Sequence, residues 1–475
     1  MDFLNRSSEL RRLHSAYNRK EGALVVVYGR RRIGKTRLLL EWTASSGGIY
    51  SVADQSTAGV QRSHLAQVLS ARLPGFADTL YPSWQVLLDR LARDATREKW
   101  RGPIVFDEFP YLVAESPELP SVMQRWVDHE AKHARLVVAI AGSSQRMMQG
   151  LVLDANAPLF GRAQEILALA PLHPNYAGRA LHIRKGADVV SAYAAWGGVP
   201  RYWELAGGEK GELLSRIDRI VLDPHGPLHR EPDRLLLEEL PPAVETRPLL
   251  DAIGSGAHRV SEIGARIGRP ATSMARPLER LVSMGLIRRD VPFGESEKSG
   301  RRSLYMIDDP FFRLWFRVVA PHRAQLVAGP RSVRLELLRR HWPMLVAQTW
   351  EDLCRRWVAR ARGTSAVVRL GPWEPARRWW HGEAAEWDVV SRSLDGKTLM
   401  LGEARWSTRP LRRADIERAA YEIRRKQRPT IPQFEGDVAV IYVLFVPTLA
   451  EGGRKFARGQ KDLVVVTADG IVAAD

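Results

Sequence analysis

The sequence predicts an α/β protein made of several domains, and three observations support this. At 475 residues the chain is too long for one ordinary hydrophobic core, so two to four domains are expected. In the N-terminal half, short apolar runs alternate with amphipathic helical patterns, as in a parallel sheet covered by helices. The pattern then changes to a group of helices, and finally to a segment rich in Arg and Trp. We therefore expect domains at 1–240, 241–320 and 335–475, the last a smaller α/β domain.

The first element is a strand, a glycine loop and a helix within residues 24–40. The run LVVVY leads into a glycine, four residues follow, and GKT then opens a leucine-rich helix. This is the strand–GxxxxGK[ST]–helix order of a phosphate-binding loop. The two glycines let backbone amides cradle phosphate oxygens, the lysine reaches the β- and γ-phosphates, and the threonine hydroxyl ligates Mg²⁺. Rather than an ordinary glycine-containing turn, the sequence predicts a nucleotide and Mg²⁺ site formed by Gly29, Arg31, Arg32, Ile33, Gly34, Lys35, Thr36 and Arg37.

Polar residues follow two later apolar runs that read as buried strands. The first run ends at Asp107 and Glu108. Asp107 is placed to hold Mg²⁺ through water, and Glu108 to polarise an attacking water as a general base. The second run, residues 136–142, ends at Ser143 and Ser144. In a parallel sheet both strand ends face the ligand, so one of these serines either senses the γ-phosphate or simply caps the next helix.

The charge, the cysteine content and the apolar runs of the sequence limit which partners and compartments are expected. The net charge is +17, which favours polyanions, above all nucleic acid, although an arginine-rich proteome would raise basicity everywhere. Cys354 is the only cysteine, which excludes an internal disulfide framework and a cysteine-based zinc site. The start, MDFLNRSSEL, has no signal-peptide apolar region, and the apolar run at 438–447 is too short to span a bilayer. We therefore expect a cytoplasmic protein with no membrane partner.

Five motifs in the first 205 residues together resemble one known family. They are YGRRRIGKT, VFDEFPYL, the strand end AGSS, APLFGRA at 157–163 and GGVPRYW at 197–203. With these motifs the chain resembles the archaeal-type ATPases, a group of AAA+/STAND-like P-loop NTPases found in archaea and bacteria. The resemblance implies a P-loop NTPase core with a helical lid, ATP and Mg²⁺ as cofactors, and hydrolysis of ATP.

The resemblance also implies roles for residues outside the phosphate loop. Arg162 of the FGR motif would be an arginine finger or sensor at the γ-phosphate, unless it is a surface arginine in a turn. A finger that acts in trans needs a neighbouring copy and therefore a homo-oligomer, whereas Arg162 acting in cis does not. Arg201 would lie in the lid and face the nucleotide. Asn5 and Arg6 would lie near the base.

The middle of the chain predicts a winged helix-turn-helix. Helical patterns at 249–254, 260–267 and 270–285 are followed by strand-like segments at 285–289 and 301–307. This order resembles a common DNA-binding unit, although many winged helices in such ATPases contact only proteins. In the DNA-binding interpretation, the third helix and the wing present to nucleic acid the side chains of Arg269, Thr272, Ser273, Arg276, Arg280, Arg301 and Arg302.

The C-terminal segment contains a predicted hairpin at 386–406, EWDVVSRSLDGKTLMLGEARW. The Asp-Gly pair at its centre indicates a type I′ turn with a two-residue loop. In that register Asp388 faces Glu403. Glu386 faces Arg405 on the same side of the hairpin. Opposed carboxylates repel unless a divalent cation or a nearby arginine compensates them.

The same spacing is a known catalytic pattern. Asp-x14-Glu-x-Lys on a hairpin is the PD-(D/E)XK pattern, whose acids hold the Mg²⁺ that activates water for phosphodiester cleavage. Asp388 and Glu403 match it, Glu351 resembles the auxiliary acid, and the C-terminal domain of the ATPase family likewise resembles these nucleases. Arg405 stands where the pattern has lysine, and an arginine cannot supply a neutral amine, although it can neutralise a scissile phosphate. The sequence thus predicts a nuclease-like fold and leaves cleavage open.

Two further features of this domain bear on its partner. Eight of the fifteen tryptophans lie between Trp342 and Trp406, where they fill a small core or stack bases. A strand is expected at 438–446. A helix at 414–425 is positioned to track a nucleic-acid backbone with Arg418, Arg424, Arg425, Lys426 and Arg428.

Three functions fit these patterns. The first is an enzyme in which ATP hydrolysis controls metal-dependent cleavage of DNA or another nucleic acid. The second is an ATP-driven switch that binds nucleic acid or protein and carries an inactive nuclease-like domain. The third is a nucleotide-dependent platform for protein partners with no role in nucleic-acid metabolism.

Overall fold

The computed structural model describes residues 3–143, 145–239, 246–298, 302–361, 366–382, 384–431, 438–460 and 462–473. Two residues with predicted roles, Ser144 and Arg301, lie outside this set. The chain divides into two compact units. The first comprises residues 1–172 and 199–201, and the second comprises residues 173–198 and 202–475. Within the residues just given, no helix combines the length and the apolarity needed to cross a bilayer.

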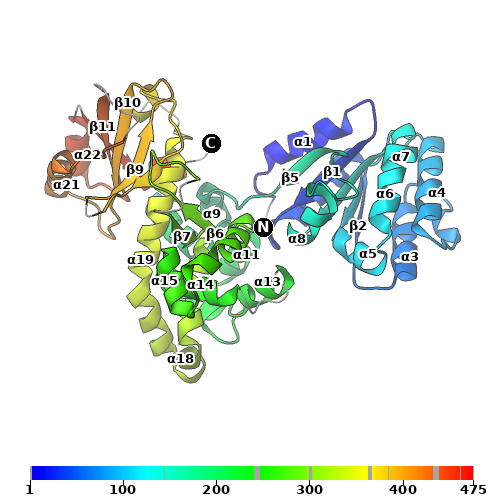
Figure 1. The fold of residues 1–475 in the computed structure, drawn as a ribbon, viewed down its shortest axis with the longest axis horizontal. Helices are drawn as coiled ribbons and strands as arrows, with labels where there is room; N and C mark the ends of the chain where they lie inside the picture. Colours follow the sequence, from blue (N-terminus) through cyan, green and yellow to red (C-terminus); the bar gives the residue numbers. More distant parts are fainter. Residues whose placement is uncertain are drawn as a thin grey trace. The chain divides into compact units, whose positions relative to one another are not determined.

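The first unit is built on a parallel five-stranded sheet (Figure 1). Its strand order is β2-β3-β4-β1-β5, and every neighbouring pair is parallel. The sequence predicts four of these strands, including β2 from the short apolar run at 48–52. It does not predict β5, which lies at an edge and alternates exposed and half-buried residues. The strands are β1 (Ala23–Tyr28), β2 (Ile49–Val52), β3 (Ile104–Asp107), β4 (Val137–Gly142) and β5 (Ala163–Ala168).

Helices cover this sheet because each carries an apolar stripe at helical spacing. In α4, for example, Leu87, Leu88 and Leu91 are fully buried. Helix α1 contacts β1 and β5, α2 contacts β2 and β3, and α4 contacts both α3 and α6 (Figure 1). The helices are α1 (Ser7–Tyr17), α2 (Lys35–Ser46), α3 (Ala58–Leu69), α4 (Trp84–Arg97), α5 (Phe109–Glu115), α6 (Leu119–Asp128), α7 (Glu130–His133) and α8 (Gln145–Met148).

The second unit begins with a helical region. Its helix α10 is buried along most of its length, since it contacts α9, α17 (Pro310–Leu314), α19 (Arg331–Val358) and α23 (Ala468–Val472). Helix α11 starts in the residues assigned to the first unit and continues into the second. The helices of this region are α9 (Pro174–Ala180), α10 (Gly186–Trp196), α11 (Pro200–Gly208), α12 (Leu213–Ile217) and α13 (Glu231–Glu239).

The helix–helix–helix–hairpin order predicted for the middle of the chain is what the structure contains. The third helix begins as a 3₁₀ turn after Pro270, and the hairpin pairs Ile287 with Ile307. The elements are α14 (Arg247–Gly254), α15 (Val260–Ile267), the 3₁₀ turn Ala271–Met274, α16 (Ala275–Ser283), β6 (Ile287–Asp290) and β7 (Leu304–Ile307). The residues predicted to face outward are exposed, namely Arg269, Thr272, Ser273, Arg276 and Arg280. Arg302 instead donates to Glu295 at 2.6 Å.

A long helix links these helices to the C-terminal sheet. Helix α19 (Arg331–Val358), yellow in Figure 1, contacts α10 and α18 as well as strands β9 and β10. It is preceded by a buried aromatic segment in which Phe311, Trp315 and Phe316 are fully buried. The preceding helices are α17 (Pro310–Leu314), the π-helical turn Trp315–Val319 and α18 (Arg323–Ala328).

The C-terminal sheet has the order β12-β11-β10-β9-β8, with β8, β9 and β10 antiparallel and β10, β11 and β12 parallel. Five of the C-terminal tryptophans are buried, so these fill the core; they are Trp350, Trp373, Trp379, Trp380 and Trp387. The elements are α20 (Ala366–Arg369), β8 (Arg377–Trp379), β9 (Trp387–Arg392), β10 (Thr398–Ala404), α21 (Arg413–Arg425), β11 (Ala439–Val446), α22 (Glu451–Arg458), β12 (Leu463–Thr467) and α23 (Ala468–Val472).

The β9–β10 hairpin has the predicted register but not the predicted turn. Gly402 pairs with Val389, as expected for a hairpin centred on the Asp-Gly pair. A type I′ turn requires two residues with positive φ, and only Gly396 has one. Instead, residues 394–397 form a wider loop closed by the Ser393 amide, which donates to the Thr398 carbonyl oxygen at 2.9 Å. Because both loops share one centre, the register is unchanged.

Candidate functional site

The phosphate loop joins β1 to α2, and its two glycines have conformations that other residues adopt poorly. Gly29 has φ 149° and Gly34 has φ 97°. A Cβ on Gly29 would lie 2.8 Å from the carbonyl oxygen of Leu169, which leaves no room for a side chain. Gly34 is also the N-cap of α2. These two positions therefore need glycine, which leaves the loop amides open to a phosphate.

Lys35 is the first residue of α2, and its side chain folds back over the loop. It is 5% exposed, and its Nζ donates to the carbonyl oxygens of Gly29 at 2.8 Å and Arg30 at 3.3 Å. Arg6 supports the same loop from the N-terminal segment. Its Nη2 donates to the carbonyl oxygens of Ile33 at 3.0 Å and Ala170 at 2.8 Å. The structure thus places Arg6 on the loop backbone and holds the lysine ammonium within the loop.

Asp107, at the end of β3, collects hydrogen bonds from two other elements. Thr36 Oγ1 donates to Asp107 Oδ2 at 2.9 Å, and the Tyr50 hydroxyl donates to the same oxygen at 2.6 Å. Burial and the hydrogen bond to Asp107 raise the pKa of Tyr50, so this phenol stays a donor. The predicted pair, Thr36 and Asp107, is brought together. Sequence reasoning missed Tyr50, which the pairing of β2 with β3 could have indicated.

Glu108 and Ser143 meet at the neighbouring strand end. Glu108 has a left-handed backbone, φ 53°, which turns its side chain toward β4. Ser143 Oγ donates to Glu108 Oε2 at 2.8 Å, and the Ser143 amide donates to the same oxygen at 3.2 Å. Because β4 lies between β1 and β3, this pair sits beside the phosphate loop. Ser143 therefore fixes a carboxylate, a contact that the sequence alone did not predict.

Arg162 is not brought to the loop within its own unit. It donates to both carboxylate oxygens of Asp128, at 2.9 and 3.0 Å. Ala163, the next residue, pairs with Leu24 at the start of β1, whereas the loop follows the far end of that strand. At about 3.3 Å per residue, the length of β1 separates them by roughly 13 Å or more.

The remaining predicted residues surround the loop. Ile33 is fully buried beneath it, whereas Arg31 and Arg37 are exposed. Arg32 has a left-handed backbone, φ 66°. Arg201 is exposed at the start of α11.

Two known protein families have models that match parts of this chain. Residues 3–205 match the model of an ATPase domain found predominantly in archaea. These residues form an archaeal-type P-loop ATPase domain. Residues 315–419 match a second model, that of archaeal and bacterial proteins of unknown function. The chain therefore combines this ATPase domain with a C-terminal domain that the second family shares.

Three further proteins are similar to this chain over about two thirds of its length or more. An uncharacterized protein of Methanocaldococcus jannaschii is 26% identical over 430 residues, which are 90% of this chain and 92% of the relative. A Walker-type ATPase of Pyrococcus abyssi is 19% identical with a TM-score of 0.52, covering 67% of this chain and 97% of its own, and shares the fold. The ORC2 protein of Aeropyrum pernix is 12% identical with a TM-score of 0.45, covering 72% of this chain and 95% of its own.

A second group of acidic residues lies outside the ATPase domain, where α19 contacts the hairpin of β9 and β10. It contains the predicted Glu351, Asp388 and Glu403. Burial, with the charge of Asp388, raises the pKa of Glu351 to about 7. The same two causes raise the pKa of Glu403. Asp388 Oδ2 accepts a hydrogen bond from the Ala404 amide at 2.9 Å. In the described part of the chain, no three His, Cys, Asp or Glu side chains form a compact metal-binding cluster.

The cation that hydrogen-bonds to Glu403 is Lys426, whereas Arg405 acts on Glu403 only through its charge. Arg405 forms an ion pair with Glu422 on α21, and Glu386 forms one with Arg378. Lys426, the C-cap of α21, donates to Glu403 Oε1. Its Nζ also lies 4.8 Å from the centroid of the buried Trp387 ring. The sequence offers no local signal for this contact, because 23 residues separate Lys426 from Glu403.

Proposed function

We propose that the ATPase domain binds ATP with Mg²⁺ and hydrolyses it, and that this controls the action of the second unit on nucleic acid. One observation carries the first part. The loop lysine, the Thr36–Asp107 contact and the Ser143–Glu108 contact converge at the carboxyl ends of three adjacent parallel strands. This edge is where nucleotides bind in open α/β sheets.

The side chains at this site can fill the roles that phosphoryl transfer requires: metal ligand, phosphate ligand and general base. The hydroxyl of Thr36 and the carboxylate of Asp107 are oxygen donors of the kind that Mg²⁺ prefers, and both would hold the ion. When bound, Mg²⁺ neutralises charge on the phosphates. Lys35 would exchange its loop carbonyls for phosphate oxygens. Glu108, oriented by Ser143, would accept a proton from the attacking water.

ATP turnover by purified full-length protein tests this assignment. We expect Lys35→Ala to lower kcat/KM by at least about 100-fold, since it removes a charge that contacts the phosphates. Glu108→Gln should retain nucleotide binding and lose turnover by about 10²–10⁴. Lys132→Ala, an exposed lysine on α7, is the matched control. Unchanged turnover in the first two variants would mean that the site is assigned wrongly.

Arg162 completes the site only from a second copy of the chain, because it lies at the other end of β1 in its own unit. We therefore propose that hydrolysis is strongest in an oligomer. Mixing Lys35→Ala with Arg162→Ala protein should restore part of the turnover that each variant lacks, since one mixed interface has both groups intact. If mixing restores nothing and Arg162→Ala alone is fully active, Arg162 has no role in hydrolysis.

For the second unit we propose metal-dependent cleavage of nucleic acid at Glu351, Asp388 and Glu403. The pairing register supports this, as does Lys426, which supplies the amine that the sequence pattern lacks. Mg²⁺ is commonly held by one or two carboxylates together with a substrate phosphate, so Asp388 and Glu403 are a sufficient donor pair. The ion would activate water. The exposed arginines of α16 would help to hold the substrate.

Cleavage assays on single- and double-stranded DNA and RNA, with Mg²⁺ or Mn²⁺, decide between this function and a switch that binds without cutting. We expect Asp388→Ala to abolish cutting and leave ATP turnover intact. Absence of cutting by the unmodified protein, with salt-dependent binding retained, favours the switch. Absence of salt-dependent binding as well favours a platform for protein partners.

A further inference from the structure

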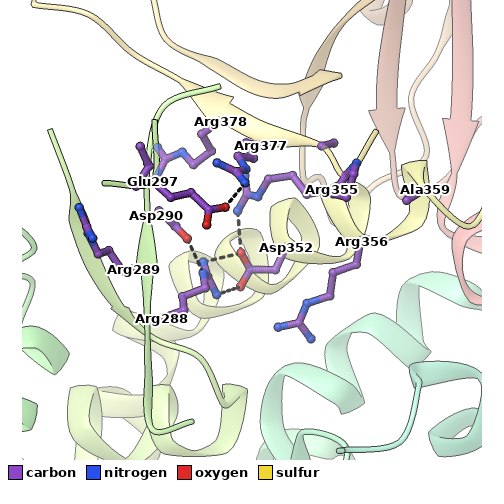
Figure 2. A pocket seen from close by; sticks show the side chains of 13 residues that line it. Arg288, Arg289, Asp290, Glu297, Asp352, Arg355, Arg356, Ala359, Arg377 and Arg378 are labelled. Carbon is purple, nitrogen blue, oxygen red and sulfur yellow. Dashed lines mark hydrogen bonds and ion pairs between the residues drawn. The ribbon is translucent and has the colours of Figure 1, made fainter. Parts of the chain in front are cut away.

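A cavity of about 500 Å³ lies within the second unit, next to the acidic group (Figure 2). Three elements enclose it: strand β6, the C-terminal end of α19, and β8 with the residues just before it. The loop after β6, in the β6–β7 hairpin, is joined to β8 because the Phe293 amide donates to the Arg378 carbonyl oxygen at 2.8 Å. Three carboxylates line the cavity, together with six arginines, namely Arg288, Arg289, Arg355, Arg356, Arg377 and Arg378. Its lining therefore carries a net charge of about +3.

The floor of the cavity is a buried ion-pair network centred on Asp352. Arg288 and Arg355 donate to Asp352 Oδ1 at 2.8 and 2.6 Å (Figure 2). Arg313, beneath them, donates to Oδ2 at 2.6 Å. Although burial opposes it, Arg288 and Arg313 hold the pKa of Asp352 well below its usual range. The guanidinium groups of these three arginines are already engaged in ion pairs with Asp352. They form a rigid positive floor rather than contacts that a ligand can take over.

The rim is different, because its arginines have weak and replaceable partners. Arg377 pairs with Glu297, whose side chain is 76% exposed (Figure 2). Arg378 pairs at 3.2 Å with the exposed Glu386. Exposed ion pairs contribute about 0–1 kcal/mol, whereas a guanidinium binds phosphate through two parallel hydrogen bonds. A phosphate can therefore displace the carboxylates at the rim without disturbing the floor.

The cavity also adjoins the acidic group through a shared residue. Arg355 lines the cavity and donates to the backbone carbonyl oxygen of Asp388 at 3.0 Å. Glu351 directly precedes Asp352 on α19. A nucleic-acid strand that is bound at the rim would therefore lead toward the acidic group of Glu351, Asp388 and Glu403.

We propose that this cavity binds a phosphate-bearing nucleotide of a nucleic-acid strand, with Arg377 and Arg378 as its phosphate ligands. The choice of ligand rests on the nucleic-acid function proposed above. The volume lies within the range of about 300–1,000 Å³ typical of small-molecule sites, so it exceeds a lone phosphate. Asp290 Oδ2, which is buried and accepts no hydrogen bond from the described residues, supplies an acceptor for a sugar or base. Bound here, the strand is positioned for the acidic group beside it.

Binding of a fluorescein-labelled single-stranded oligodeoxynucleotide to the full chain, in EDTA, tests this proposal. EDTA removes cleavage from the readout, so failure of the nuclease assignment does not affect the result. We expect the double variant Arg377→Ala/Arg378→Ala to bind at least about tenfold more weakly. Its salt dependence should fall by about 1.4 in slope, which is the loss of two phosphate contacts on a single strand. Unchanged ATP turnover and melting temperature show that this variant folds.

Two further variants make the test specific. Arg340→Ala/Arg413→Ala removes two exposed, ion-paired arginines elsewhere in the same unit and should leave binding unchanged. Glu297→Gln releases Arg377 from its partner and should tighten binding severalfold. Equal weakening in both double variants, or no effect of Glu297→Gln, contradicts the proposal. Displacement of the strand by free AMP at equal concentration would show that the cavity serves a free nucleotide instead.

Discussion

The two acidic sites of this protein use the same residue types in different electrostatic states. In the ATPase domain, neutral groups satisfy the carboxylates: Thr36 and Tyr50 donate to Asp107, and Ser143 donates to Glu108. In the second unit the carboxylates instead interact with one another. Burial and the charge of Asp388 raise the pKa of both neighbouring glutamates, and the nearby lysine and arginines offset only part of that rise.

The difference indicates what each site still needs. Lys35 donates to two loop carbonyl oxygens, and a phosphate that replaced them would compensate its charge. Lys426 cannot leave Glu403 so readily, because a buried carboxylate without its partner is destabilising. The first site is prepared for a nucleotide. The second gains most from a cation or from a substrate that brings one.

The largest effect expected from this comparison concerns the two candidate cations of the second site. Lys426→Ala should lower metal-dependent cleavage by about 100-fold or more, because Lys426 is the amine at Glu403. Arg405→Ala should change cleavage by no more than about threefold, because its ion pair with Glu422 is exposed. Initial rates on a labelled oligonucleotide measure both. If Arg405→Ala instead has the larger effect, the catalytic cation is Arg405 of the β9–β10 hairpin, the position where the sequence pattern has lysine.

Local patterns in the sequence predicted the phosphate loop and four strands of the first sheet, because each depends on residues that are close in the chain. Strand β5 was missed because AQEILA buries only one residue fully and resembles a polar segment. The position of Arg162 followed from the direction of that strand, so it was missed too. The hairpin register was predicted although the turn type was wrong, because both turns share a centre. Lys426 depends on the packing of α21 against the sheet, which no spacing encodes.

A smaller effect is expected from Ser143, which orients the carboxylate of Glu108 but takes no direct part in the proposed reaction. Ser143→Ala removes the hydroxyl that holds Glu108 but leaves the carboxylate in place. We expect kcat for ATP to fall about tenfold, the value of one hydrogen bond to a charged group, with KM little changed. Ser143→Thr should restore turnover because its hydroxyl can still donate. A change in KM alone would instead mean that Ser143 contacts the nucleotide directly.

The smallest expected effect is on stability, and it depends on pH through Glu351. The pKa of this carboxyl is about 7 in the folded chain and 4.5 in the unfolded one. Below pH 4.5 both states are protonated, so Glu351 costs no free energy of folding. As the pH rises from 4.5 to 7, the unfolded state loses its proton first, and the folded state is progressively destabilised. Above pH 7 the cost is complete.

Glu351→Gln removes this titration while keeping the shape of the side chain, so it should stabilise the protein by about 1–3 kcal/mol at pH 8 and by almost nothing at pH 4. Urea unfolding at the two pH values measures the difference. Glu336→Gln, on the exposed face of the same helix, should show no such pH dependence. If Glu351→Gln is equally stabilising at both pH values, the cause is packing rather than charge. If it has no effect at pH 8, neither burial nor the charge of Asp388 raises the pKa of Glu351, and the contrast between the two acidic sites fails.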